Sequence, residues 1–557
     1  MNKNNSQLNL HFKDSSESKK HNKNLDIRIN ILISSFLIFS LLIIFKLLLL
    51  GFDKKDFFTR ETFLNESVNR RSIVDRNNNI IAHNLKTYDL LLRSSKVKNF
   101  DNLKIKLKIN FLDINFDEIE KNKNKSFYII KKNLSPVEFN KVLKLGEPSL
   151  ELVGKETRIY PNKNLFSHII GNIDVDQNGI SGVEYYFNNH LLEKNKINDP
   201  LTLSLDLRVQ YQIRNTLLEG MQYFKAKGAS AVLMDSKNGE IISMVSLPDF
   251  NPNDRSIASN RDNYFNKNTK GLYEMGSVFK VFAIANGIEQ KKIKRDQVFS
   301  NLPSRVYCGK FPIDEYRYAK DKKNLSVNDI LVKSSNIGTI RIIQEAGLES
   351  YQQFLENLEL FNTPTVEVPE VATSIKKRWG KCRTLTAGFG HGISTSPVQL
   401  TRAYASIVNG GELLDVTLLK NEILKKSKKV ISEETSSLMT KILRTNVDRS
   451  YKVNGSGRKA DIDGYDVEGK TGTAEKPSKN QKGYSKDIMN IFTSSFLVND
   501  RRYVLTVIYD EPKGSPELWG HSRRESGWNA AYTNGQIIKK IGPILNTLKI
   551  QKFAKLN

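Results

Sequence analysis

Residues 275–280 read Met-Gly-Ser-Val-Phe-Lys, and this stretch decides how the rest of the chain is interpreted. It places the hydroxyl of Ser277 three residues before the amine of Lys280, at the start of a predicted helix. Positions i and i+3 of a helix share one face, so the two side chains can touch. A serine hydroxyl is a weak nucleophile at neutral pH and needs an adjacent base, which a lysine supplies when desolvation or a neighbouring cation lowers its pKa. The stretch therefore predicts a nucleophilic serine with a lysine base.

Two further motifs separate this pattern from chance. Ser16 and Lys19 show the same spacing in a polar tail, so a single Ser-x-x-Lys says little. Downstream, however, Ser334-Ser335-Asn336 and then Lys470-Thr471-Gly472-Thr473 follow in the order that active-site serine penicillin-recognising enzymes use. Three such motifs in one order predict an acyl-transfer site.

Length, charge and cysteine content set the limits of the interpretation. A chain of 557 residues predicts two globular units, each able to bury a core. The formal charge of +26 comes from lysines dispersed along the chain, so we expect a solvated surface and no nucleic-acid partner, while attraction to an acidic polymer or membrane surface stays open. Cys308 and Cys382 lack the spacing of a zinc site, so no metal and no cofactor are predicted, and their redox state stays open.

A membrane anchor is predicted near the N-terminus. Residues 1–26 are polar and lysine-rich without apolar periodicity, which is typical of a disordered tail. Residues 31–50 are almost wholly apolar and about the 20 residues that a spanning helix needs, and no cleavage pattern follows. The lysines before the helix predict a cytoplasmic tail (1–30), so everything after the anchor lies outside the cytoplasm. Lys46 either extends its amine to the membrane–water interface or contacts a partner inside the membrane.

Residues 51–200 are predicted to form a separate mixed α+β domain. Residues 71–77 are strand-like and end in the asparagines 77–79, which suit a turn. Residues 85–150 alternate polar and apolar segments without a strong motif. Glu184 stands among glycines in a segment that looks buried, so we expect it to pair with Arg71 or Arg158.

Residues 201–548 are predicted to form an antiparallel sheet with helices, followed by a tail over 549–557. The strands expected are 231–234 and 241–245, joined by a hairpin, and 465–467, 490–498 and 503–509 around and after the third motif. The helices expected are 277–290, several within 327–361, 397–408, and 528–548, which would cover the sheet. His391 lies among turn glycines and is interpreted as structural rather than as a catalytic base.

With these residues in view, the chain from Arg71 to about Leu545 resembles the class B penicillin-binding proteins, in particular their cell-division branch in alphaproteobacteria. Beyond the three active-site motifs, the resemblance rests on residues 71–77, 158–161, 179–184, 204–206, 389–394 and 527–531. Two departures are small: Met275 stands where many relatives have proline, and Tyr532 replaces a proline after two alanines.

The resemblance implies an N-terminal pedestal and a C-terminal transpeptidase domain, an α+β fold with an antiparallel sheet flanked by helices. It implies that Ser277 attacks the bond between the two terminal D-alanines of a peptidoglycan stem peptide while Lys280 takes its proton. Ser334 and Asn336 would bridge this lysine and the substrate. A second stem peptide then resolves the acyl-enzyme, and β-lactams inhibit the site.

The resemblance also assigns the residues of the third motif. Lys470 would face the substrate carboxylate, with Thr471 and Thr473 as hydroxyl donors, and Gly472 would leave room for the peptide. The backbone amides of Ser277 and Thr473 would form the oxyanion hole. The implied location is the inner membrane with a periplasmic catalytic domain, and the implied partners are an FtsW-type glycosyltransferase and other divisome proteins.

Several other functions are weighed against this one. A β-lactamase would be a free domain with an extra deacylating base, and a β-lactam sensor without turnover would carry more membrane helices and a His-Glu-x-x-His motif. A bifunctional class A protein would need a glycosyltransferase domain, for which residues 53–200 are too short. A divisome scaffold would not need three intact motifs. The class B transpeptidase of cell elongation, with the same chemistry, remains the alternative.

Overall fold

The computed structural model describes residues 16–52, 70–111, 113–254, 261–317, 319–374, 378–420, 427–478 and 483–554. The chain divides into two compact units, residues 1–67 and residues 68–557. Three parts of the expected organisation lie outside the described residues: the first 15 residues of the tail, the start of the pedestal at 53–69, and the last residues, 555–557.

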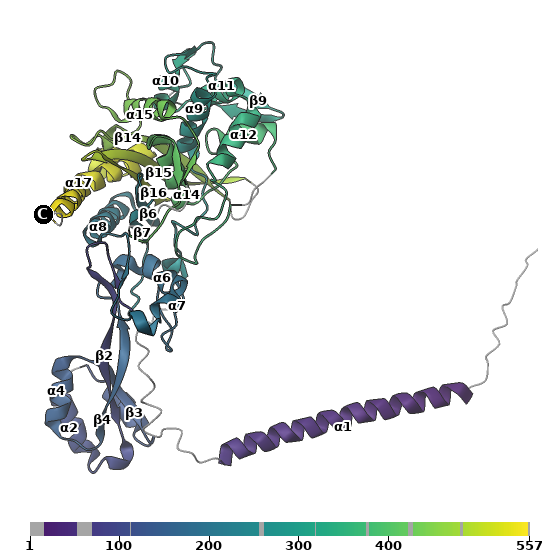
Figure 1. The fold of residues 1–557 in the computed structure, drawn as a ribbon, viewed down its shortest axis with the longest axis vertical. Coiled ribbons are helices and arrows are strands. Elements are labelled where there is room, and N and C mark those ends of the chain that lie inside the picture. The colour runs from purple at the N-terminus through teal and green to yellow at the C-terminus, as the bar shows by residue number, and fades with distance from the viewer. Residues whose placement is uncertain are drawn as a thin grey trace, which may run out of the picture. The chain divides into compact units, whose positions relative to one another are not determined.

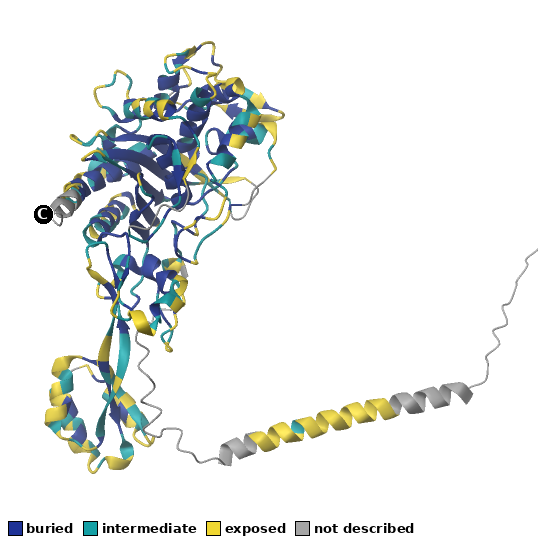
Figure 2. Ribbon diagram, in the orientation of Figure 1, coloured by how far each residue is buried: buried dark blue, intermediate teal, exposed yellow. Residues whose placement is uncertain are grey.

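The first unit contains one long helix, α1 (Ser16–Phe52). Residues 27–46 are long and apolar enough to cross a membrane, and Figure 2 shows them as exposed along the helix. An apolar helix of this length fits the predicted anchor. The prediction of a disordered tail is wrong for residues 16–26, which are helical, because extending an existing helix costs far less than starting one.

The pedestal is built on a five-stranded sheet in the order β3-β2-β1-β5, with β4 also paired to β2. Its strands are β1 (Ile73–Val74), β2 (Ile80–Leu92), β3 (Tyr128–Leu134), β4 (Leu150–Ile159) and β5 (Leu201–Thr202). β1 and β2 form the predicted hairpin, in which Asn78 has a φ of 66°. β5 pairs in parallel with β1, so one sheet includes residues from both sides of the boundary expected at 200, and that boundary stays a prediction.

Three helices pack against the pedestal strands and confirm the mixed α+β character of residues 85–150. They are α2 (Phe100–Asn110), α3 (Phe116–Asn122) and α4 (Pro136–Leu145). Leu103 and Leu107 of α2 share a small core with Leu90 and Leu92 of β2. Three short helices follow, α5 (Ser167–Ile170), α6 (Gly182–Tyr186) and α7 (Asn188–Leu191).

Glu184 of α6 is fully buried between two arginines. Its Oε1 accepts from Arg158 Nε at 2.8 Å, and its Oε2 accepts from Arg70 Nε at 2.6 Å. The expected pairing with Arg158 is confirmed, but the alternative with Arg71 is wrong: Arg71 donates to Asp199 at 3.0 Å instead. The two adjacent arginines thus have different partners: Arg70 binds Glu184, and Arg71 binds Asp199.

The C-terminal domain is built on a five-stranded antiparallel sheet in the order β14-β15-β16-β6-β7 (Figure 1). Its strands are β6 (Gly228–Asp235), β7 (Ile241–Leu247), β14 (Glu468–Pro477), β15 (Tyr484–Val498) and β16 (Arg501–Asp510). The expected hairpin of β6 and β7 is confirmed. β14 pairs only with β15 among the described strands, so its other side is a sheet edge.

Helices cover both faces of this sheet. Alternate residues of β6, Ala231 and Leu233, share one core with α8 (Leu207–Phe224) and α17 (Ala530–Ala554). Val232 and Met234 share the other core with α9 (Lys280–Glu289) and α14 (Pro397–Val408). Helix α17 covers the sheet as expected but continues six residues past position 548, into the expected tail.

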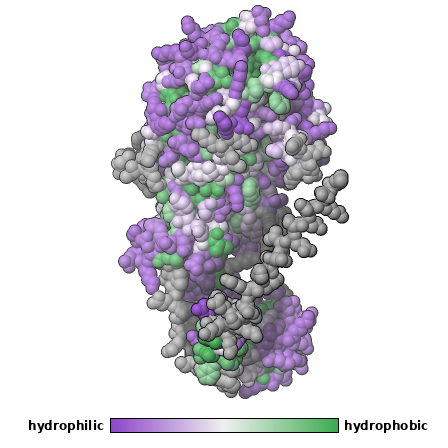
Figure 3. Space-filling model, turned by 90° about the vertical axis from the view of Figure 1, so that its right-hand side faces the viewer, coloured by the Kyte–Doolittle hydropathy of each residue, from purple (hydrophilic) through white to green (hydrophobic). Residues whose placement is uncertain are grey.

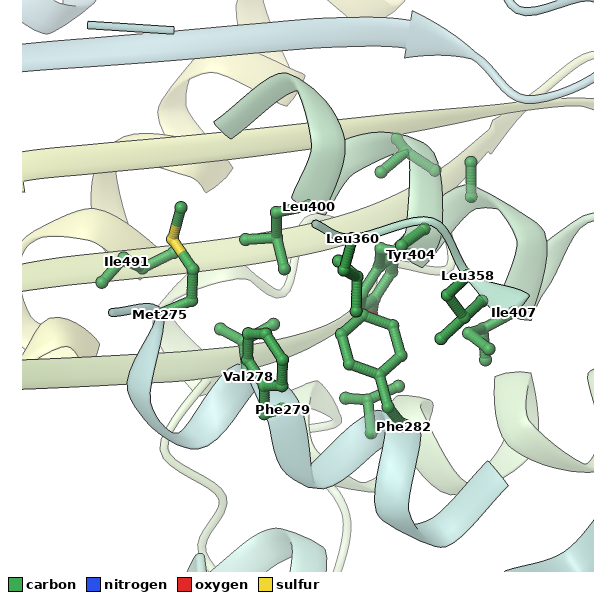
Figure 4. Close-up of a cluster of buried hydrophobic side chains, with 14 of the residues drawn as sticks. Met275, Val278, Phe279, Phe282, Leu358, Leu360, Leu400, Tyr404, Ile407 and Ile491 are labelled. Carbon is green, nitrogen blue, oxygen red and sulfur yellow. The ribbon is translucent and has the colours of Figure 1, made fainter. Parts of the chain in front are cut away.

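Figure 4 shows how the segment that carries Ser277 packs in the core formed with α9 and α14. Met275, Val278 and Phe279 point toward Ile491 of β15 and Leu400 of α14. All five side chains are fully buried. The nucleophile segment is therefore held in place by the sheet and by α14.

The remaining elements of the C-terminal domain are shorter strands and further helices. They are β8 (Val298–Phe299), β9 (Arg305–Cys308), β10 (Phe311–Asp314), β11 (Leu325–Ser326), α10 (Val327–Lys333), α11 (Asn336–Ala346), α12 (Leu348–Asn357), α13 (Lys381–Ala387), β12 (Glu412–Leu414), β13 (Ser427–Lys429), α15 (Glu433–Val447) and α16 (Pro516–Trp519). Hydrophilic side chains predominate over this domain on the face shown in Figure 3, as expected for dispersed charge.

Candidate active site

Ser277 and Lys280 lie side by side at the junction of two helical segments. Residues 276–279 form a 3-10 turn, and α9 begins at Lys280, so Ser277 precedes the α-helix that was expected to begin with it. In a 3-10 turn residues i and i+3 eclipse each other. Lys280 Nζ accordingly lies 3.1 Å from Ser277 Oγ. Ser277 is half-buried, whereas Lys280 is fully buried.

The amine of Lys280 is also held by the second motif. It contacts Ser334 O at 2.5 Å, Ser334 Oγ at 3.1 Å and Asn336 Oδ1 at 2.8 Å. Burial, and after it the charge of Lys470, lowers the pKa of Lys280 well below its usual range, against an opposing effect of Glu315. The lowered pKa makes the neutral amine, the form that can act as a base, easier to reach for Lys280 than for an exposed lysine.

Ser334-Ser335-Asn336 forms the corner between two helices. Ser334 ends α10 with a φ of 57°, an unusual conformation for a residue other than glycine. Ser335 caps α11, and its Oγ accepts from Gly338 N at 2.8 Å. The corner turns the side chains of Ser334 and Asn336 toward Lys280, as the motif predicts.

Lys470 reaches the same place from strand β14. Its Nζ lies 3.1 Å from Ser334 Oγ, and the side chain is fully buried. Burial lowers the pKa of Lys470 to about 7. Thr471 Oγ1 lies 2.5 Å from Ser456 Oγ, while Thr473, which is exposed, donates to Asn490 Oδ1 at 3.1 Å.

Two glycines let the nucleophile turn and β14 touch. A Cβ on Gly276, whose φ is +54°, would lie 2.5 Å from Thr473 O. A Cβ on Gly472 would lie 2.3 Å from Met275 O. The missing side chain of Gly472 thus makes room for the backbone before Ser277, whereas its expected role of leaving room for the peptide stays a prediction.

A cavity of about 670 Å³ continues from the site along β14. Its walls include Ala474 and Lys476 of β14, Tyr484 and Trp379. Glu274 also lines it and accepts from Tyr484 Oη at 2.8 Å. The cavity therefore offers an apolar and aromatic surface with charges of both signs.

His391 lies at the edge of this cavity region and not at the lysines. Its Nδ1 is 3.6 Å from Glu274 Oε2, and its ring packs against Tyr484. None of the contacts described for Lys280 involves His391, in line with the structural role expected for it. Among the described residues no group of His, Cys, Asp and Glu could hold a metal.

Sequence reasoning missed Glu315 and Ser456 and left the redox state of the two cysteines open. Glu315 accepts from Ser335 Oγ at 2.5 Å and from Asn336 N at 2.6 Å, although no pattern in the sequence links it to the motif. Cys308 and Cys382 form a disulfide, with their Cα atoms 5.5 Å apart. The bond ties β9 to α13, and the two-cysteine composition was the only available signal for it.

Comparisons with known proteins agree with this geometry. Residues 229–531 match the penicillin binding protein transpeptidase domain, and residues 65–198 match the penicillin-binding protein dimerisation domain. The probable peptidoglycan D,D-transpeptidase FtsI of Caulobacter vibrioides is 31% identical over 491 residues, 86% of this chain and 81% of that protein. The peptidoglycan D,D-transpeptidase FtsI of Escherichia coli K12 is 27% identical over 449 residues, 74% of this chain and 73% of that protein.

A solved structure shows the same fold. Penicillin binding protein 3 of Mycobacterium tuberculosis, complexed with aztreonam, superposes with a TM-score of 0.67 and 21% sequence identity. The match covers 86% of this chain and 96% of that one.

Proposed function

Because this chain belongs to the class B penicillin-binding proteins, we propose that it is the septal peptidoglycan D,D-transpeptidase of cell division, acting through an acyl-enzyme on Ser277. The single observation that carries the assignment of Ser277 is its contact with the buried amine of Lys280 at 3.1 Å. Relatives named FtsI favour division over the elongation enzyme, which has the same chemistry.

In the first half-reaction, Ser277 Oγ attacks the carbonyl carbon between the two terminal D-alanines, and neutral Lys280 takes the hydroxyl proton. The C–N bond then breaks, an ester to Ser277 remains, and the proton passes to the leaving amine. Ser334 supports this relay, since its hydroxyl lies 3.1 Å from the amines of both Lys280 and Lys470.

In the second half-reaction, an amine of another stem peptide attacks the ester. A new amide bond forms as the ester C–O bond to Ser277 breaks, and the proton lost by the attacking amine passes through Lys280 to Ser277 Oγ. The backbone amides of Ser277 and Thr473 would bind the oxyanion in both steps, each donor contributing about 3 kcal/mol. The close approach of Gly276 to Thr473 supports this pairing, because it holds the two segments together.

Substrate recognition would use the edge of β14. A stem peptide can add to this edge as an extra strand, with main-chain hydrogen bonds giving affinity. Lys470 would attract the terminal carboxylate, with Thr471 and Thr473 as hydroxyl donors. The cavity beside Ala474 would take the part of the stem peptide that precedes the D-alanines.

The apolar helix α1 fits a single-pass membrane anchor. We infer that it lies in the inner membrane with its N-terminus in the cytoplasm and the catalytic domain in the periplasm. Lysines before the helix support this orientation, and so does the Cys308–Cys382 disulfide, because disulfides persist outside the cytoplasm. An FtsW-type glycosyltransferase is the expected partner, together with other divisome proteins.

Labelling with a fluorescent penicillin tests the assignment. The full-length protein should carry the label on the peptide that contains Ser277, as identified by mass spectrometry, and Ser277→Ala should not be labelled. Ser16→Ala, which removes the serine of another Ser-x-x-Lys spacing, is the matched control and should label like the wild type. Label on another serine, or full labelling of Ser277→Ala, would contradict the assignment.

A further inference from the structure

The buried carboxylate of Glu315 contacts the second motif at several points. Glu315 follows β10, and only 8% of its surface is exposed. Its Oε2 accepts from Ser335 Oγ at 2.5 Å and from Ile337 N at 3.3 Å. Its Oε1 accepts from Asn336 N at 2.6 Å and from its neighbour Tyr316 N at 2.7 Å.

These contacts fix both the backbone and the hydroxyl of the helix corner. Asn336 and Ile337 are the first residues of α11, whose amides have no partner inside the helix. A carboxylate at this helix end gains both hydrogen bonds and a favourable interaction with the helix dipole. Ser335 is held from two sides, because its hydroxyl donates to Glu315 while accepting from Gly338 N.

The same strand end also orients the side chain of Asn336. Asn336 Nδ2 donates to the carbonyl of Asp314 at 3.1 Å, so its Oδ1 faces Lys280 Nζ at 2.8 Å. Backbone and side chain of Asn336 are thus both positioned by residues 314 and 315. The hairpin of β9 and β10 that presents them is tied to α13 by the Cys308–Cys382 disulfide.

We propose that Glu315 is a positioning residue for the transpeptidase reaction, whose carboxylate holds Ser335 and Asn336 so that Asn336 and Ser334 keep the amine of Lys280 on Ser277. The inference rests on the proposed acylation of Ser277. It goes further because Glu315 belongs to none of the three motifs and touches neither Ser277 nor Lys280 by any described hydrogen bond.

Glu315 and Lys470 act on Lys280 with opposite signs. The ammonium of Lys470 lowers the pKa of Lys280, and the carboxylate of Glu315 raises it. Removing the charge of Glu315 should therefore lower the pKa of Lys280 further and also displace the Lys280 amine from Ser277. The rate constant of acylation falls at low pH, where Lys280 is protonated, and this part of the pH profile is its acid limb. A residue that served stability alone would change neither the position of the acid limb nor the limiting rate constant.

The test measures the second-order rate constant of acylation by a fluorescent penicillin between pH 5 and pH 9, on full-length protein in detergent. For Glu315→Gln we expect a limiting rate constant about 10- to 100-fold lower, because small displacements of catalytic groups are costly. The acid limb should move about half a pH unit or more toward lower pH. Asp321→Asn, which neutralises an exposed carboxylate on the following turn, should leave both unchanged.

The inference would be overturned if Glu315→Gln kept the wild-type rate constant and acid limb, or if Asp321→Asn changed both by as much as Glu315→Gln does. If Glu315→Gln does not fold, Glu315→Asp keeps the charge and withdraws the carboxylate by one methylene. It should lower the rate constant with the acid limb in place, and a wild-type rate constant would again overturn the inference. Absence of label on Ser277 in the wild-type protein would instead contradict the proposed function itself.

Discussion

Lys280 and Lys470 each place their Nζ atom 3.1 Å from one oxygen, the hydroxyl of Ser334. Both lysines are fully buried, and two buried ammonium groups around one hydroxyl repel each other. The arrangement therefore favours one neutral amine and one cation. We assign the neutral amine to Lys280, because its pKa is lowered by burial and by Lys470.

The first prediction concerns Lys470→Ala. Loss of the cation should lower the second-order acylation rate constant about 10- to 100-fold, as expected for a lost charge-assisted hydrogen bond. The charge of Lys470 lowers the pKa of Lys280, so its removal should raise that pKa and move the acid limb to higher pH. The label should stay on Ser277, and Lys452→Ala, at an exposed lysine, serves as the control. An unchanged rate constant would mean that Lys470 does not face the substrate.

The second prediction concerns the alkaline limb. Lys470 has a pKa of about 7, so the free enzyme loses this cation as the pH rises through 7. The second-order rate constant, which reports groups of the free enzyme, should therefore decline above about pH 7. Lys470→Arg should lower the maximum but remove the decline, because a guanidinium stays charged. A persistent alkaline limb in Lys470→Arg would assign it to another group.

The third prediction concerns the pedestal. Glu184→Ala leaves Arg70 and Arg158 buried without their shared partner, and breaking a buried pair costs about 3 to 5 kcal/mol. The free energy of unfolding from urea denaturation should fall by that amount. Glu193→Ala removes an exposed pair with Lys196 and should leave the free energy of unfolding almost unchanged. Equal effects of the two substitutions would show that burial does not matter at Glu184.

The predictability of these features depends on how local they are. Helix 397–408 was expected with its observed bounds, because Ser396 caps it, Pro397 opens it and two glycines follow it. The three motifs meet as expected, because in the enzymes that this chain resembles the same motifs form one site. Arg70 could not be chosen over Arg71, because the two arginines are adjacent and only the three-dimensional contacts decide which of them meets Glu184.

Long-range contacts that belong to no motif could not be predicted from the sequence. Glu315 lies 20 residues before Ser335 and reaches it only because the β9–β10 hairpin turns the chain back onto α11. Gly472 was assigned to the substrate, yet the backbone it accommodates, at Met275, is almost 200 residues away in the chain. Neither contact has a periodicity that the sequence could display.

The fourth prediction concerns the disulfide. Replacing Cys308 and Cys382 together by serine should lower the free energy of unfolding by about 2 to 4 kcal/mol, since the bond restrains the unfolded chain. A reducing agent should lower the thermal midpoint of the wild-type protein and leave that of the double variant unaltered. A wild-type midpoint that is indifferent to reduction would show that the bond contributes nothing to stability.

The fifth prediction concerns the anchor. A protein that begins near Asp53 should be soluble and should bind penicillin, because the three motifs lie far beyond α1, but it should not support division. A generic apolar helix in place of residues 31–50 should restore membrane location and only partly restore division, if this segment contacts a polymerase partner. Full rescue by the generic helix would reduce the segment to a tether. Rescue by the soluble protein would contradict the prediction outright.

The pairing of β6 with β16 governs when an active enzyme can exist. Val232 lies opposite Thr506 in the sheet, so strands from near the start and the end of the C-terminal domain must find each other. Such distant pairings fold slowly, because a long loop must close before any contact compensates for it. A chain synthesised from its N-terminus contains Ser277 and Lys280 well before β16 is available. Until then β6 has one unpaired edge, which exposes the incomplete domain to aggregation and proteolysis.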